Sequence, residues 1–194
     1  MATIGVKGFY FADYGIDEST SKIKFTNGKK VAKSCEVEVN YQIADAKLYA
    51  DNGLDDEVRA LTGIDLAATP NDINSDFSEI LGITETASPF YEASAEDKFY
   101  SVGESTEGIY KGFAIIVDKR ESGINKWRLQ IYSKTKWYPA DNESYQTKQE
   151  SITFNTSAVN GSAFMDNEGK YYYYQDYTSF AAAETAIKTL FSIA

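Results

Sequence analysis

Two apolar runs joined by a polar connector, all within residues 110–138, constrain the fold of this chain more than any other stretch. In the second run Trp127, Leu129 and Ile131 alternate with Arg128, Gln130 and Tyr132, a pattern typical of a strand with one buried and one solvated face. The first run, residues 113–117, is apolar on both faces, so a central place in a sheet is expected. The connector, residues 118–125, includes Gly123, which can adopt a positive φ. The stretch predicts a long β-hairpin that a second layer must cover.

Further strands are predicted on both sides of this hairpin. The clearest alternation lies in residues 31–43, where Cys35, Val37, Val39 and Tyr41 share one face and Glu36, Glu38, Asn40 and Gln42 share the other. Residues 5–14, 22–25, 61–68, 149–159 and 171–174 also have strand-like patterns. Asn27-Gly28 is typical of a two-residue hairpin turn, because a type I′ turn needs positive φ at both positions.

Two helices are predicted. Thr69 and Pro70 suit the cap and first position of a helix over about residues 71–81, and Gly82 suits its end. An apolar stripe over residues 180–191 predicts a C-terminal helix, about 179–191. The expected fold is mainly β (β+α): a β-sandwich or barrel of two packed antiparallel sheets with one flanking helix and the C-terminal helix. A single domain, 1–194, is expected, with a surface excursion at residues 83–109.

The composition argues against most catalytic chemistry. The chain has no histidine, which removes imidazole acid–base catalysis and histidine metal sites, and one cysteine, Cys35, which excludes an internal disulfide. Cys35 lies on an apolar strand face and is expected to be a buried hydrophobe. No phosphate-binding glycine loop is present, and the acidic residues 51–57 lack the ligand order of a calcium loop. We expect no cofactor, no metal and no enzyme activity, although carboxylate pairs distant in sequence stay open.

No apolar run approaches the roughly 20 residues that span a bilayer, and the N-terminus lacks the order of a secretory signal. A soluble protein made in a cytoplasm, without a membrane anchor, is expected.

The formal charge of −10 is unevenly distributed along the chain. Residues 51–97 contain twelve acidic residues and one basic residue, whereas residues 22–34 contain five lysines and no acid. Residues 111–148 contain eight basic and four acidic residues. Such asymmetry indicates either an internal dipole, or a surface that meets its opposite on another copy, or solvated faces that keep the chain soluble.

Five segments together resemble one protein family. They are IGVKGFYFADY (4–14), KFTNGKKVAKSCEVEVNY (24–41), AKLYADNGLDDEV (46–58), DINSDFSEILG (72–82) and KWRLQIYSKTKWYPADNESYQTKQESITFNTSAV (126–159). The set resembles the major tail proteins, or tail-tube subunits, of long-tailed non-contractile bacteriophages. The resemblance implies two crossed sheets in each subunit, six copies closing into a ring, and rings stacking into a tube that conducts DNA during ejection. One sheet of each subunit would join its neighbours into a continuous inner barrel.

The resemblance also implies partners and a location. The first partner is the chain itself, and others would be the tape measure, tail terminator and distal tail proteins. The location would be the tail of the virion, and DNA would pass without specific binding. An acidic bore would repel phosphate and let the duplex slide.

Two hypotheses assign residues to this role. Glu36 and Glu38, on the polar face of their strand, are expected to line the bore, with the outer surface of the tube as the open alternative. Contacts between subunits are expected to join charges drawn from Asp55, Asp56, Glu57, Lys29, Lys30, Lys126 and Arg128. Two alternatives stay open: a tube subunit of a phage-tail-like bacteriocin, and a β-sandwich module that binds a ligand through its aromatic side chains.

Overall fold

The computed structural model describes residues 2–50, 53–71, 75–86, 99–103, 108–139 and 158–193. Its strands are β1 Ala2–Ile16, β2 Ile23–Ala32, β3 Ser34–Ala50, β4 Gly53–Pro70, β5 Thr84–Thr86, β6 Phe99–Ser101, β7 Lys111–Glu121, β8 Ile124–Pro139, β9 Val159–Ala163 and β10 Tyr172–Tyr177. Its helices are α1 Ser75–Ile80 and α2 Phe180–Phe191. The mainly β class with a short helix and a C-terminal helix is therefore confirmed.

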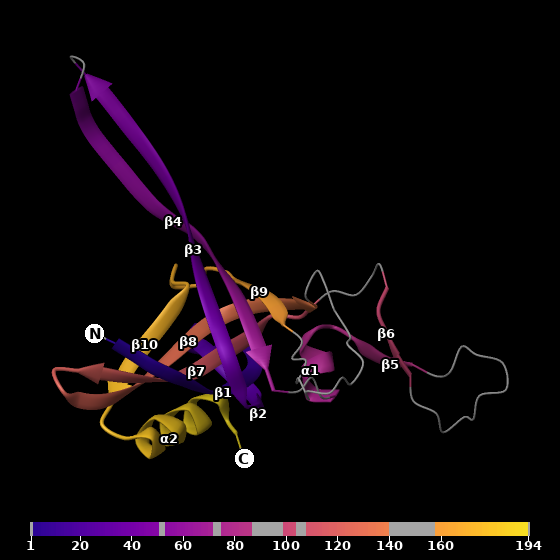
Figure 1. The fold of residues 1–194 in the computed structure, drawn as a ribbon. Helices are drawn as coiled ribbons and strands as arrows, with labels where there is room; N and C mark the ends of the chain where they lie inside the picture. The colour runs from indigo at the N-terminus through magenta and orange to yellow at the C-terminus, as the bar shows by residue number, and fades with distance from the viewer. Residues whose placement is uncertain are drawn as a thin grey trace, which may run out of the picture.

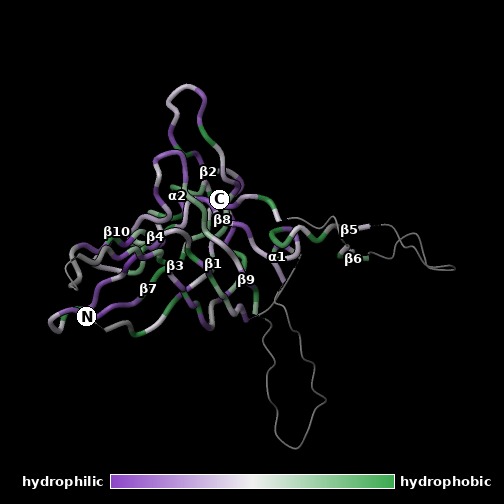
Figure 2. Tube along the Cα trace, turned by 90° about the horizontal axis from the view of Figure 1, so that it is seen from above, coloured by the Kyte–Doolittle hydropathy of each residue, from purple (hydrophilic) through white to green (hydrophobic). Residues whose placement is uncertain are grey.

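Eight strands form one antiparallel sheet, in the order β2-β1-β7-β8-β9-β4-β3, with β10 also paired to β8. The long strand β8 serves two partners on the same side: residues 127–132 pair with β10, and residues 135–139 pair with β9. Strands β5 and β6 form a separate pair that lies beyond α1, to one side of the main sheet (Figures 1 and 2). The strands predicted to lie in two sheets are thus hydrogen-bonded into a single large one.

The sheet curls back on itself. Strands β2 and β3 are at opposite ends of the strand order, yet only Lys33 separates them in the chain. Two hydrogen bonds join Lys33 to Asn71, the residue that follows β4. The backbone N–H of Lys33 donates to Oδ1 of Asn71 at 2.8 Å, and the N–H of Asn71 donates to the carbonyl of Lys33 at 3.0 Å. The first and last strands of the order therefore meet at one corner of the molecule.

This curling buries the central strands on both faces. One core lies inside the curl and contains the aromatic rings of Phe9, Phe11, Phe113, Tyr132 and Trp137, with Ile64, Leu66, Val159 and Phe77 packed against them. The other core lies under α2, whose Ala183, Ile187 and Phe191 pack on Tyr10, Ile116 and Leu129. Every residue from Lys111 to Val117 is buried, which confirms the central place predicted for the apolar run.

The long hairpin predicted within residues 110–138 is present as β7 and β8, with two differences from the prediction. Its turn consists of Ser122 and Gly123 alone, with φ of 50° and 82°, so the connector is shorter than expected. Tyr132, predicted on a solvated face, is 0% exposed. The reason is tertiary: the curled sheet covers one face of β8 while α2 covers the other.

The turn predicted at Asn27-Gly28 is wrong. Both residues lie inside β2, where the register with β1 shifts, and Asn27 has a positive φ of 53° as part of that bulge. Gly28 is required there because a side chain would collide with the carbonyl oxygen of Phe191. The hairpin turn between β1 and β2 instead spans residues 17–22, where Oδ1 of Asp17 accepts bonds from the N–H groups and hydroxyls of Ser19 and Thr20.

The N-terminal cap predicted for the first helix is wrong. Thr69 and Pro70 belong to β4 and pair with β3, so neither caps a helix, and the described part of α1 starts at Ser75. The predicted C-terminal helix is confirmed: the hydroxyl of Ser179 caps it by accepting the N–H of Ala182 at 3.2 Å. Within the predicted excursion, β5 and β6 are described, whereas residues 87–98 and 104–107 are outside the described residues, as are the side chain of Cys35 and most of the strand predicted at 149–159.

Candidate functional site

The outer part of the β3–β4 hairpin, residues 43–50 and 53–61, forms an arm that projects from the body (Figure 1). Among the described strands β3 pairs only with β4, and β4 reaches β9 only over Ile64–Ala68. The pairing between β3 and β4 continues outward from Ile43 opposite Leu61 to Ala50 opposite Gly53. The arm is therefore a two-stranded ribbon with an open edge on each side.

Apolar side chains on the arm are exposed to solvent. Ile43 is 59% exposed, Leu61 38% and Val58 60%. Ile43 and Leu61 are directly opposite each other, so they share one face, while Val58 is opposite Ala46 on the other. A lone two-stranded hairpin is marginally stable in water, and a long open edge invites pairing with another chain. The arm has the properties of a segment that another molecule covers.

The acidic residues predicted to meet a neighbour lie at the outer end of this arm. Glu57 Oε1 accepts a hydrogen bond from Nε of Arg59 at 2.7 Å and lies 3.9 Å from Nζ of Lys47. Asp56 Oδ1 accepts the backbone N–H of Glu57 at 2.8 Å. Asp55 belongs to β4, and its side chain is outside the described part of the chain.

The four basic residues predicted at the same contacts each have a carboxylate partner within the chain. Nζ of Lys29 lies 2.7 Å from Asp76 Oδ1, and Nζ of Lys30 lies 3.1 Å from Glu184 Oε1. The remaining two pairs are Lys126–Glu121 at 2.7 Å and Arg128–Asp176 at 2.6 Å. The hydrogen bond from Arg128 holds the pKa of Asp176 below its usual value. Carboxylates of a neighbouring copy would have to compete with these intrachain partners.

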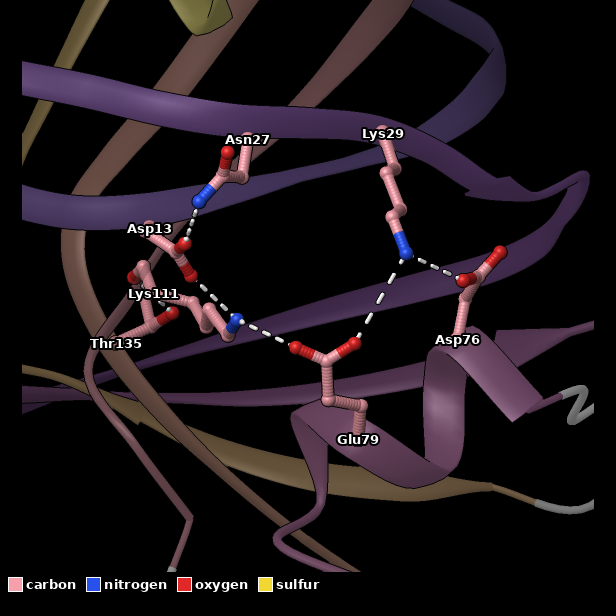
Figure 3. A network of polar contacts seen from close by, with 7 residues as sticks. All are labelled: Asp13, Asn27, Lys29, Asp76, Glu79, Lys111 and Thr135. Atoms are coloured by element: carbon pink, nitrogen blue, oxygen red, sulfur yellow. Dashed lines mark hydrogen bonds and ion pairs between the residues drawn. The ribbon is translucent and has the colours of Figure 1, made fainter.

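The pair that contains Lys29 is part of a larger network that sequence reasoning missed (Figure 3). Its centre is Lys111 at the start of β7, whose side chain is 7% exposed and whose ammonium lies 2.5 Å from Asp13 Oδ1 and 3.5 Å from Glu79 Oε1. Lys29 joins Asp76 and lies 3.9 Å from Glu79, so lysines of β2 and β7 both reach carboxylates of α1. The residues line a cavity of about 440 Å³ between these elements.

The electrostatics of this network favour its ionised form. Burial by itself would raise the pKa of Asp13, but hydrogen bonds from Lys111 and from Asn27 Nδ2 outweigh that effect and hold the pKa below its usual value. The hydrogen bond to Asp76 raises the pKa of Lys29. The charges of the network are paired, and Phe77 and Ile80 of α1 pack in the main core, so the network fixes α1 against β1, β2 and β7. We call this network the Lys111 clamp. Nothing in the local sequence around Lys111 indicated it, because the carboxylates come from β1 and α1.

Glu36 and Glu38 lie on β3 close to the corner, on the face opposite to Val37 and Val39. The two valines pack against the main core, whereas the two glutamates are exposed. The predicted alternation of this strand is therefore confirmed for residues 36–39.

Among the residues that the structure describes, no cluster of three or more His, Cys, Asp or Glu side chains is arranged to hold a metal ion. No helix in the described ranges is both long enough and apolar enough to cross a membrane. The chain matches no model of a known protein family, and no curated protein matches it either.

Proposed function

We propose that this protein is the subunit of a phage tail tube, in which six copies close into a ring and stacked rings conduct DNA. The observation that carries the proposal is the arm. In a monomer, the side chains of Ile43, Leu61 and Val58 on the projecting ribbon stay exposed and add nothing to stability. In a polymer, the ribbon would be buried between copies. One of the segments that resemble major tail proteins, AKLYADNGLDDEV (46–58), contributes to both strands of the arm.

The architecture also supports the two crossed sheets that the resemblance implies for each subunit. We treat the curled sheet as two crossed layers that share β8: one with β2, β1, β7 and β10, the other with β9, β4 and β3. The core lies between them, and α2 covers the outer face of the first layer. The second layer presents a polar outer face that includes Glu36 and Glu38. In the tube this face would line the bore and join its neighbours into the inner barrel.

The net negative charge of the chain favours passage of DNA through the tube. Six copies at −10 would give about −60 per ring before counterions bind, so phosphates would be repelled from the wall. The tube would belong to the virion tail and would meet tape measure, tail terminator and distal tail proteins at its ends. The expected contacts between the acidic arm and basic residues of another copy stay a prediction, and tube assembly that does not change with salt would contradict them.

Electron microscopy of the purified protein tests the proposal directly. Rings or tubes are expected at high concentration, and a protein that stays monomeric under every condition would overturn it. A matched variant isolates the arm: residues 44–60 are replaced by Asn-Gly, which can join Ile43 to Leu61 because the two are directly opposite. This variant should keep the folded body, seen as cooperative thermal unfolding, and lose tube formation, whereas Ser122→Asn, at the unrelated β7–β8 turn, should assemble normally.

A further inference from the structure

The outer face of the second layer carries opposite charges at its two margins. Strand register gives the row Asn40, Asp65, Ser162 and Lys136 across β3, β4, β9 and β8, and beside it the row Glu38, Ala67, Asn160 and Tyr138. Residues directly opposite each other in antiparallel strands share a face. We call this surface the polar face. Its β3 margin carries Glu36 and Glu38, and its β8 margin carries Lys134 and Lys136.

The two margins are too far apart to interact within one copy. Neighbouring strands lie about 4.8 Å apart, so the three steps from β3 to β8 separate the margins by about 14 Å. Among the described residues, no hydrogen-bond or ion-pair partner contacts the side-chain carboxylate of Glu36 or of Glu38. Both carboxylates therefore lie on an edge strand of the sheet, and no cation in the described part of the chain pairs with them.

The β8 margin holds its ammonium groups on an aromatic ring. The last pair between β7 and β8 is Lys111 with Thr135, and beyond it Gly108 lies against Trp137, where an added Cβ would fall 2.6 Å from the Trp137 carbonyl oxygen. Next to it the ring of Tyr110 lies 4.4 Å from Nζ of Lys134 and 4.8 Å from Nζ of Lys136. Tyr110 itself is 39% exposed. Two cations on one aromatic ring form a fixed basic surface, the lysine–tyrosine patch.

We propose that the β3 margin of one copy docks on the lysine–tyrosine patch of a second copy, so that Glu36 and Glu38 face Lys134 and Lys136 across the join. Two carboxylates meet two ammonium groups, and the edge and the patch lie at opposite margins of the same face. The contact is therefore head-to-tail, and repetition closes a ring if the rotation between copies permits. The inference rests on the proposed tube subunit and identifies the seam between neighbours in a ring. Glu36 and Glu38 would then border the bore and join the copies.

A cross-linking experiment tests the seam on the wild-type chain. A carbodiimide joins a carboxylate to an amine only when the two are in contact. Assemblies made from a mixture of ¹⁵N-labelled and unlabelled protein should give mixed-isotope peptides that join Glu36 or Glu38 to Lys134 or Lys136. Assemblies whose cross-links lie elsewhere would overturn the seam while leaving the tube in place. Wild-type protein that never assembles would overturn both proposals.

Charge reversal gives a second test that does not depend on one variant. Glu36→Lys/Glu38→Lys and Lys134→Glu/Lys136→Glu should each raise the concentration needed for assembly about tenfold or more at low salt, because like charges then face each other. An equimolar mixture of the two variants, and the chain that carries all four substitutions, should assemble again. The control Glu18→Lys/Lys22→Glu changes charge at the exposed β1–β2 turn and should behave as wild type. Normal assembly of either reversed variant, or failure of the mixture to assemble, would contradict the seam.

Discussion

Replacing Lys111 with methionine removes the charge at the centre of the Lys111 clamp while keeping most of the buried side-chain volume. The change leaves Asp13 without the ammonium 2.5 Å away and with Asn27 as its remaining side-chain partner. A hydrogen bond between charged groups contributes about 1.5–3 kcal/mol, and because Asp13 is 35% exposed, solvent screening reduces this to about 1–2 kcal/mol. We expect that loss in the free energy of unfolding at pH 7.

The pH dependence provides the sharper measurement. Because the folded-state pKa of Asp13 is held below its usual value, its contribution to stability is fully present above the unfolded-state pKa and is lost as pH falls through the folded-state pKa. The stability difference between wild type and Lys111→Met should therefore shrink below about pH 4, as Asp13 becomes protonated in both.

Urea unfolding at low protein concentration, followed by tryptophan fluorescence to which the buried Trp137 contributes, measures both quantities. Adding Asp13→Asn completes a double-mutant cycle, in which the double variant should be more stable than the sum of the single losses predicts. Lys22→Met, in an exposed turn, is the control and should have little effect. Additive losses in the cycle, or a difference between wild type and variant that is independent of pH, would refute the role assigned to Lys111.

Three further predictions concern the arm, the core and one loop. Ile43→Asp should reduce assembly seen by sedimentation while changing monomer stability by no more than about 0.5 kcal/mol, because the side chain is exposed; unchanged assembly would exclude this face of the arm from contacts. Trp137→Ala should cost about 3–5 kcal/mol in thermal unfolding, since its fully buried indole packs on Phe11 and Phe113; a loss below 1 kcal/mol would contradict that packing. Asp166→Ala should cost about 1–3 kcal/mol, because its carboxylate accepts bonds from the Ser133 and Tyr173 hydroxyls and from two backbone N–H groups. Although burial opposes it, these bonds lower the pKa of Asp166, so the difference from wild type should fade as pH drops below about 4, which acid titration of the melting temperature would check.

The spacing of apolar residues predicted the buried face correctly in elements that are covered on one side only. In β3 the alternation of Val37 and Val39 with Glu36 and Glu38 gave the correct faces, and in α2 the stripe through Ala183 and Ile187 gave the correct buried side. Patterns failed where a partner distant in sequence set the geometry. Asn27-Gly28 has the backbone preference of a turn, but pairing with β1 continues on both sides of it, so the two residues form a bulge within β2.

The candidate site divides in the same way. The acidic character of residues 51–57 and the basic character of residues 22–34 are visible in the sequence, and so is the exposed face of β3. The arm was not predicted as such, because the exposed Ile43 and Leu61 look like core residues until the extent of the pairing is known. The Lys111 clamp and the lysine–tyrosine patch were also missed, since each joins residues from separate elements.

The sequence alone determined the β-rich class, the buried central strand, the C-terminal helix and the asymmetry of charge, because all of these depend on residue type and on spacing along the chain. Tertiary structure alone decided that the eight strands form one curled sheet, that β8 is covered on both faces around Leu129–Tyr132, and which charges are paired. The physical reason is that burial and ion pairing depend on distances between segments far apart in sequence. These distances are set by how the whole sheet closes, with the chain passing from one end of it to the other through the single residue Lys33.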